Sequence, residues 1–263
     1  MKRFVYIFLG LLGVTFLLTS LTAEPAPVKV LIITGQNNHK WPQTTAELKE
    51  VLEETQRFEV SVTRNIEKLA PAKLKDYDVI VSNWNLYRHR RGIPEHLQWS
   101  EELRAAYIDF VKNGGGHVAF HAGTSTFYEW EDYQKVGIAT WRNGTTHGPS
   151  HTFEVRMEEV EHPVTAGLGN FKMWDELWQK LDVADKDAQV LTSSYCAKEY
   201  KGRDVWEPST FVGQFGEGRT AYTSFGHEVR SFEKPQLRVL FARLIEWAAT
   251  GEVTIPAPES AAE

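Results

Sequence analysis

The sequence contains a single cysteine, Cys196. One cysteine can form no intrachain disulfide and cannot build a thiolate metal cluster, so we expect neither in this chain. Positive charge is also scarce, because 29 Lys and Arg residues stand against 35 Asp and Glu residues, giving a net charge of −6. This surplus of negative charge would repel a phosphate backbone, and nucleic acid is therefore not expected as a partner.

The N-terminal apolar run is too short to cross a membrane. Phe4–Leu18 has about 15 residues, whereas roughly 20 are needed to span a bilayer. Lys2 and Arg3 precede this run, and the small, polar segment Thr19–Ala23 follows it, which is the order of parts in a signal peptide. We expect a signal peptide over residues 1–23 and a secreted or periplasmic protein without stable membrane insertion. An uncleaved membrane anchor is the alternative.

No internal repeat or low-complexity tract interrupts the rest of the chain. About 240 residues follow the expected cleavage site, which is enough for one domain with a sizeable core. We expect that domain over residues 28–254, after a short linker at residues 24–27. The Pro- and Ala-rich residues 255–263 are expected to form a flexible tail.

Continuous apolar runs predict strands that are buried on both faces. In the first half of the chain helical patterns separate these runs. One such helix has a capping-box pattern at Thr44 and Glu47, and another has Ser100 as a candidate N-cap and stops at Gly114–Gly116. A last amphipathic helix is expected after the final strand, with its apolar face over Leu237–Ala248. Strands are expected at Val28–Thr34, Phe58–Thr63, Asp78–Ser82 and His117–His121, and shorter ones near His151–Met157, Gln189–Ser193, Thr210–Phe215 and Arg219–Phe225.

This alternation of strand and helix favours an α/β fold with a mostly parallel central sheet flanked by helices. In such sheets, ligands bind beyond the carboxyl ends of the strands. Four predicted strands are followed by His, Asn or small polar residues, which core packing does not require. The segments are Gly35–His39, Asn83–Asn85, His121–Ser125 and Gly226–Glu228.

These strand ends supply the candidate catalytic residues. Imidazoles titrate near neutral pH, so His39, His121 and His227 could move protons at a carbon beside a carbonyl. Glu228 and Asp175 are candidate acid–base or orienting carboxylates. Each residue also has a structural alternative, such as a hydrogen-bonded core histidine or a solvated carboxylate. Candidate substrate-binding residues are Asn38, Trp41, Asn83, Trp84, Thr124 and His147.

The same three histidines are a candidate metal site. Three imidazoles on one rim would suit zinc or a similar divalent ion, which could polarise a carbonyl. The chain has no short metal motif such as His-Glu-x-x-His, so the metal signal comes only from the predicted placement of His39, His121 and His227.

Several segments together resemble the trehalose-utilisation (ThuA-like) family. The similarity is carried by Gly114–Gly123, His162–Leu168, the pair Asp175 and Glu176, Gly218–His227 and Trp247–Ala249. The resemblance covers about Val28 to Gly251, and it implies a flavodoxin-like sheet of the class I glutamine amidotransferase-like type. It also implies a role in sugar catabolism, notably through 3-keto sugars.

Glutaminase activity is not expected despite this fold. Amidotransferases carry a nucleophilic cysteine in the turn after the equivalent strand, and here that turn carries His121 while Cys196 lies elsewhere. We expect an exported enzyme acting on a sugar, 3-keto-sugar or glycoside by isomerisation, elimination or hydrolysis. The alternatives are a protein-interaction module that uses the Arg-rich insertion Tyr87–Trp99, or a non-catalytic sugar-binding protein that uses Trp41, Trp84, Trp130 and Trp141.

Overall fold

The computed structural model describes residues 26–89, 92–142 and 144–258. The expected signal peptide lies outside the described residues. Within the described part of the chain, no helix is both long and apolar enough to cross a membrane.

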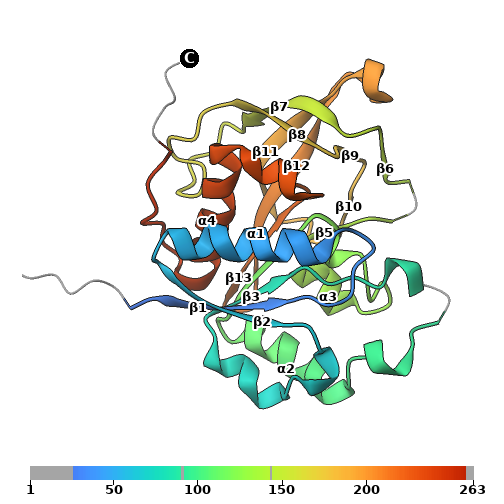
Figure 1. Cartoon of the computed structure of the whole chain (residues 1–263), viewed down its shortest axis with the longest axis vertical. Coiled ribbons are helices and arrows are strands. Elements are labelled where there is room, and N and C mark those ends of the chain that lie inside the picture. The colour runs from blue at the N-terminus through green and yellow to red at the C-terminus, as the bar shows by residue number, and fades with distance from the viewer. Residues whose placement is uncertain (1–25, 90–91, 143, 259–263) are drawn as a thin grey trace, which may run out of the picture.

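A single nine-stranded sheet organises the molecule (Figure 1). Its strand order is β2-β1-β3-β4-β13-β12-β11-β7-β8. The first five strands in this order are parallel, and the remaining neighbours pair antiparallel. The bounds are β1 Val28–Ile33, β2 Phe58–Thr63, β3 Val79–Ser82, β4 Gly116–Phe120, β7 His151–Met157, β8 Phe171–Asp175, β11 Gln189–Cys196, β12 Val205–Phe215 and β13 Gly218–Thr223.

Helices cover both faces of the parallel half. On one face, α1 (Trp41–Glu54) and α4 (Pro235–Thr250) pack together, and on the other α2 (Glu101–Lys112) packs with α3 (Glu131–Val136). Strand β1 explains why both faces need cover, since Val30 and Ile32 face the first core and Leu31 and Ile33 the second. The mostly parallel α/β sheet expected from the sequence is therefore confirmed.

Two short ribbons lie outside the main sheet. β5 (Ala139–Thr140) pairs with β10 (Asp182–Val183), and β6 (Thr146–His147) pairs with β9 (Trp178–Gln179). The second ribbon places His147 directly opposite Trp178. Three of the short 3₁₀ segments follow strands of the parallel half of the sheet. They are η3 (Tyr87–His89) after β3, η5 (His121–Thr124) after β4 and η7 (Val229–Glu233) after β13.

Of the two helix N-caps predicted from the sequence, one is confirmed and one is wrong. The Ser100 cap is confirmed, because its hydroxyl accepts the Leu103 N–H at 3.2 Å. The capping box at Thr44 is wrong: α1 begins at Trp41 with Pro in its first turn, and Thr44 is a buried residue inside the helix. Proline at this position fixes the backbone angle that a helix start needs, so no side-chain cap is required.

The C-terminal segment is anchored further than expected. The buried carboxylate of Glu246 accepts hydrogen bonds from the backbone N–H groups of Thr254 and Ile255. Arg57 forms an ion pair with the same carboxylate at 2.8 Å. Ile255, which the sequence assigned to a flexible tail, is only 8% exposed. The ordered domain thus continues past the boundary at residue 254.

The strand directions decide where loops meet. Because β12 and β7 both run against their neighbours, β11 and β8 point the same way as the parallel strands. The carboxyl ends of β1, β3, β4, β13 and β8 therefore all reach one edge of the sheet.

Candidate functional site

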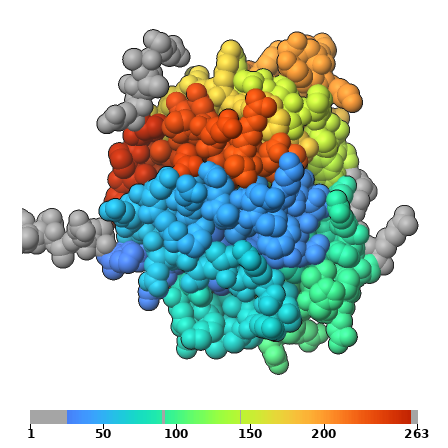
Figure 2. Space-filling view, viewed as in Figure 1, coloured from blue at the N-terminus to red at the C-terminus, as the bar shows by residue number. Residues whose placement is uncertain are grey.

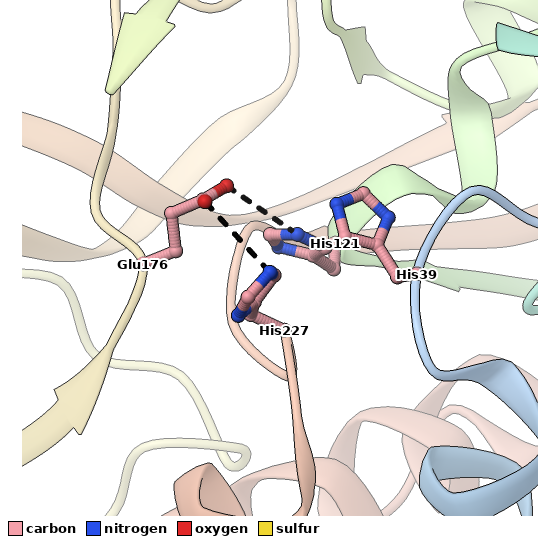
Figure 3. Close-up of side chains that lie close together, drawn as sticks. All are labelled: His39, His121, Glu176 and His227. Carbon is pink, nitrogen blue, oxygen red and sulfur yellow. Dashed lines mark ion pairs between the residues drawn. The ribbon is translucent and has the colours of Figure 1, made fainter. Parts of the chain in front are cut away.

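Four side chains converge at this edge from four different strand ends (Figure 3). His39 follows β1, His121 follows β4, Glu176 follows β8, and His227 follows β13. The ring centroid of His39 lies 4.6 Å from that of His121 and 5.0 Å from that of His227, and the last two lie 5.1 Å apart. One potential ligand atom from each of the four side chains lies within 4.8 Å of all the others. The three histidines singled out from the sequence thus lie together, and Glu176 joins them.

His121 is held in a conformation that few residues adopt. Its φ is 45°, in the left-handed region, directly after β4. The Tyr222 hydroxyl donates to the His121 carbonyl at 3.0 Å, and the ring Nδ1 lies 2.9 Å from the carbonyl of Ser224. A carbonyl can only accept, so Nδ1 carries the proton and Nε2 presents a lone pair. Nε2 is buried and has no hydrogen-bond partner among the described residues. Strain of this kind is typical of functional positions.

Asn37 orients His39. Its Oδ1 accepts from the His39 backbone N–H at 3.0 Å and lies 3.1 Å from the ring Nδ1. The same oxygen accepts from Asn85 at 2.7 Å, and the Asn37 amide donates to Asn83 Oδ1 at 3.0 Å. Two loops therefore fix the ring with Nδ1 protonated, so that Nε2 carries the lone pair that a metal would need. Outer contacts of this type orient histidine ligands in metal sites.

Asp175 positions the backbone that carries His227 and Glu176. Its carboxylate accepts the backbone N–H groups of Gly226 at 2.8 Å, His227 at 3.2 Å and Glu176 at 2.8 Å. Asp175 is fully buried, and burial raises its pKa to about 7. Gly226 has a φ of 97°, which permits the turn that presents His227. Asp175 was expected as an acid–base or orienting group; these contacts favour orientation.

Glu176 connects the cluster to a pocket. Its Oε1 accepts from the Trp178 indole at 2.7 Å, and its Oε2 lies 3.1 Å from His147 Nδ1. The same carboxylate is 3.8 Å from His121 Nε2 and 3.7 Å from His227 Nε2 (Figure 3). These two separations are too long for hydrogen bonds. They are close to the spacing of about 3.3 Å between two ligands that each lie about 2.0–2.1 Å from one tetrahedral zinc ion.

Burial and repulsion from neighbouring charged groups favour the neutral forms of His39 and His121. Burial, followed by the nearby His227, His147 and Arg88, lowers the pKa of His39 to about 3. Burial and then the neighbouring histidines also hold the pKa of His121 well below its usual value. A metal ion requires the unprotonated imidazole. Three imidazole nitrogens and one carboxylate oxygen therefore fit a divalent transition metal such as zinc.

A pocket opens beside the cluster. It contains about 380 Å³ of empty space, part of which is open solvent. Trp141 packs edge-on against Trp178 with centroids 5.0 Å apart and against His147 at 5.6 Å. The lining residues are Asn38, His39, Tyr87, Ala122, Ser125, Trp141, His147, Glu176 and Trp178.

Only some of the predicted binding residues line this pocket. Asn38 and His147 do. Asn83 is buried; it donates to Thr45 of α1 at 2.9 Å and accepts from the Asn37 amide at 3.0 Å, so it supports the loop that carries His39. Thr124 is also buried, and its hydroxyl donates to the carbonyl of Ala139 at 2.7 Å.

Two predicted aromatic residues and one carboxylate belong to neither the cluster nor the pocket lining. Trp84 is 1% exposed and packs in the second core, and half-buried Trp41 begins α1 without lining the pocket. Glu228 forms a surface ion pair with Lys40 at 3.0 Å. Cys196 ends β11, where burial raises its pKa. It belongs to neither the cluster nor the pocket lining.

Glu176, Ser125 and Tyr87 were not among the candidate site residues from the sequence, although Glu176 belongs to the noted pair with Asp175 and Ser125 to the strand-end segment His121–Ser125. Alternate side chains are buried at Phe171–Asp175, and this alternation predicts a strand that ends just before Glu176, but it does not show which way the strand points. Among the four tryptophans considered for sugar binding, Trp141 alone lines the pocket.

The fold and the strand-end site define a class I glutamine amidotransferase-like protein in which His121 occupies the turn after β4. The family model for ThuA, described as trehalose utilisation, matches residues 29–248. The chain therefore belongs to the ThuA family and is a sugar-related protein associated with trehalose utilisation. No curated protein matches the sequence significantly.

Solved structures agree with this assignment. A putative ThuA-like protein from Parabacteroides merdae is 27% identical, with a TM-score of 0.78, over 89% of this chain and 94% of that one. A second, from Bacteroides uniformis, is 22% identical with a TM-score of 0.64, over 89% and 97% of the two chains. A cytoplasmic protein from Salmonella typhimurium shares the fold at 14% identity and a TM-score of 0.59, over 84% and 100%.

Proposed function

We propose that this chain is an exported enzyme that acts on a sugar or keto-sugar, with a divalent metal held by His39, His121, His227 and Glu176. One observation carries the proposal: a potential ligand atom from each of these four side chains lies within 4.8 Å of all the others, although each residue follows a different strand. Packing does not require such convergence. Export is supported by the signal-peptide pattern at the N-terminus.

The chemistry of the donors supports a metal-assisted reaction. A divalent ion bound here would polarise a sugar oxygen that reaches the cluster. The residues around it have separate tasks: Asn37 and Asp175 fix the donors, and Trp141 forms a wall for the sugar ring.

His147 is the group best placed to take up a proton from a bound sugar. It lines the pocket without belonging to the four-residue cluster. Its Nδ1 lies 2.7 Å from the Gly148 carbonyl and 3.1 Å from Glu176, so Nδ1 carries the proton and Nε2 has the lone pair. A proton from the carbon beside a carbonyl would move to Nε2. The electron pair of that C–H bond would form a carbon–carbon double bond while the π pair of the carbonyl moves onto its oxygen, giving an enolate.

Isomerisation is completed when the former carbonyl carbon takes a proton, its oxygen becomes a hydroxyl, and the hydroxyl on the first carbon loses its proton to form the new carbonyl. Elimination is completed when the enolate re-forms its carbonyl and the glycosidic oxygen leaves from the next carbon with a proton returned by His147.

Metal analysis tests this proposal directly. The purified full chain is expected to contain close to one equivalent of a divalent transition metal by elemental analysis. His121→Ala should lose most of it, whereas His96→Ala, which removes an exposed histidine, should not. Turnover of a methyl 3-keto-glucoside, followed by NMR, should fall in parallel with metal content. Wild-type protein that binds no divalent metal after incubation with zinc or manganese would contradict the proposal. Metal and sugar binding without turnover would favour a binding protein instead.

A further inference from the structure

We propose that Ser125 is a specificity-determining residue that hydrogen-bonds a hydroxyl of a neutral sugar ring lying against Trp141. This inference rests on the proposed function only in taking a sugar as the ligand. It adds the residue that recognises the ring and the class of sugar that fits the pocket.

The Ser125 hydroxyl is buried without a partner at the pocket wall. Ser125 directly follows η5, lines the pocket and is 1% exposed. Its Oγ has no hydrogen-bond partner among the described residues. The backbone is fixed, because the Ser125 N–H donates to the Ala122 carbonyl at 2.9 Å. A buried hydroxyl without a partner is unfavourable, so a ligand that supplies one recovers that cost on binding.

Asn38 offers a second unpaired atom on the same pocket. Its Oδ1 is buried with no partner among the described residues, and its Nδ2 lies 3.5 Å from His39 Nε2, at the limit of a hydrogen bond. A serine hydroxyl can donate and accept, and an asparagine amide can do both through its two ends. Sugar hydroxyls have the same dual character. The two unpaired groups therefore match a polyhydroxylated ring.

The remaining lining favours a ring without charge. Trp141 is held by Trp178 and His147 and is only half-buried, so part of its indole stays open to a ligand. Flat aromatic rings pack well against the C–H faces of sugars. The described residues that line the pocket include no Lys or Arg, and Glu176 contributes negative charge. A sugar phosphate or a uronic acid would find no lysine or arginine among these lining residues to pair with.

Thr126 provides a matched control. Its hydroxyl is also buried and unpaired among the described residues, and it is the next residue in the chain. Unlike Ser125, Thr126 does not line the pocket. Ser125→Ala and Thr126→Val each remove one unpaired buried hydroxyl. A loss of sugar affinity that both variants share would come from the fold, whereas a loss seen only in Ser125→Ala would come from the pocket.

Calorimetric titration with defined sugars tests the inference. The metal-loaded full chain is titrated with the methyl α-glycosides of glucose, galactose and mannose, and then with the four monodeoxy analogues of the tightest binder. Ser125→Ala should weaken binding of the parent glycoside by about 5–100-fold. One deoxy analogue should bind the wild type more weakly by a similar factor, and Ser125→Ala should bind this analogue and the parent equally. Thr126→Val should behave like the wild type.

Three results would overturn the inference. Ser125→Ala could retain wild-type affinity and selectivity, the two variants could weaken binding equally, or the wild type could bind glucuronate or glucose 6-phosphate but none of the neutral glycosides. The last result would leave the proposed metal enzyme intact. Conversely, the expected deoxy pattern in a protein that binds no metal would support the sugar subsite and contradict the metal enzyme.

Discussion

Two histidines at the two ends of β4 show what separates a structural residue from a functional one. His117 is fully buried, its ring packs edge-on against Tyr107 with centroids 5.8 Å apart, and burial lowers its pKa to about 3. His121 is almost as buried, and burial is likewise the main reason that its pKa is low. A depressed pKa therefore does not distinguish them.

Convergence with other donors does distinguish them. His121 meets two further imidazoles and a carboxylate, and its backbone is strained at a φ of 45°. His117 lies in regular strand near the opposite edge of the sheet and is not part of the four-residue cluster. Core packing is therefore a sufficient explanation for the placement of His117. The placement of His121, beside three other potential metal ligands, is better explained by a function.

The largest expected difference between the two histidines is in turnover. His121→Ala removes a donor from the cluster, and loss of one positioned catalytic group typically costs about 10²–10⁴-fold. We expect turnover of a methyl 3-keto-glucoside to fall by that factor, with metal content reduced. His117→Phe keeps an aromatic ring against Tyr107 and should retain turnover within a few-fold. Equal losses in both variants would show that the fold, rather than the cluster, carries the effect.

A smaller effect is expected from Asp175→Asn. The asparagine amide retains only one acceptor oxygen, whereas the Asp175 carboxylate accepts N–H groups of Gly226, His227 and Glu176. The NH₂ group would face at least one backbone N–H, so His227 and Glu176 should lose their fixed positions. Loss of such outer contacts typically weakens metal binding by about 10–100-fold. Competition with a metal chelator measures this affinity, and unchanged affinity in a folded variant would exclude the positioning role.

The fold was predictable where the chain is locally consistent. Phe58–Thr63 and His151–Met157 were predicted with the bounds that the structure has, because turn residues delimit their apolar patterns. The rim histidines followed from the rule that parallel strands present their carboxyl ends at one edge. Thr44 shows the limit, because the local pattern of a capping box did not reveal that Pro42 had already started the helix.

Glu176 was harder to predict because its place depends on distant pairing. β7 pairs antiparallel with β11, and β8 pairs antiparallel with β7. Only these two pairings together direct the end of β8 toward the site, and no local sequence pattern reveals them. The contact of Asp175 with Gly226 likewise joins residues 51 positions apart. Trp84 and Trp141 could not be told apart from the sequence, since aromatic residues serve cores and pockets equally well. The structure places the first in the core and the second at the pocket.

A further test concerns acid stability, where His117 should contribute without any role in the site. Its pKa is about 3 in the folded chain and near 6.5 when unfolded. The unfolded state therefore binds a proton at higher pH, so folding stability falls as pH drops from 6.5 toward 3. One such group contributes a slope of up to about 1.4 kcal/mol per pH unit.

His117→Phe should remove this part of the slope. Urea denaturation at pH 7, 5.5 and 4.5 would measure the free energy of unfolding, and the variant should lose less stability than the wild type over this range. His96→Ala, at an exposed site, serves as the control and should follow the wild type. Parallel curves for wild type and His117→Phe would mean that His117 is protonated in the folded protein without cost.

The smallest effect on turnover is expected at Cys196. Like His117, it is a buried residue outside the four-residue cluster, so its replacement tests whether the chemistry depends on the cluster. Cys196 is buried at the end of β11, and burial raises the pKa of its thiol, so the reactive thiolate is disfavoured. The position where an amidotransferase carries its nucleophile is occupied by His121. Cys196→Ser should therefore keep turnover and metal content within a few-fold of wild type, with a modest loss of stability from placing a hydroxyl in an apolar site.

Because Cys196 is the single cysteine, treatment of the wild type with iodoacetamide offers an independent check. Abolished turnover in a folded Cys196→Ser variant, or on alkylation of the native protein, would make the thiol part of the chemistry and would displace the histidine cluster as its centre.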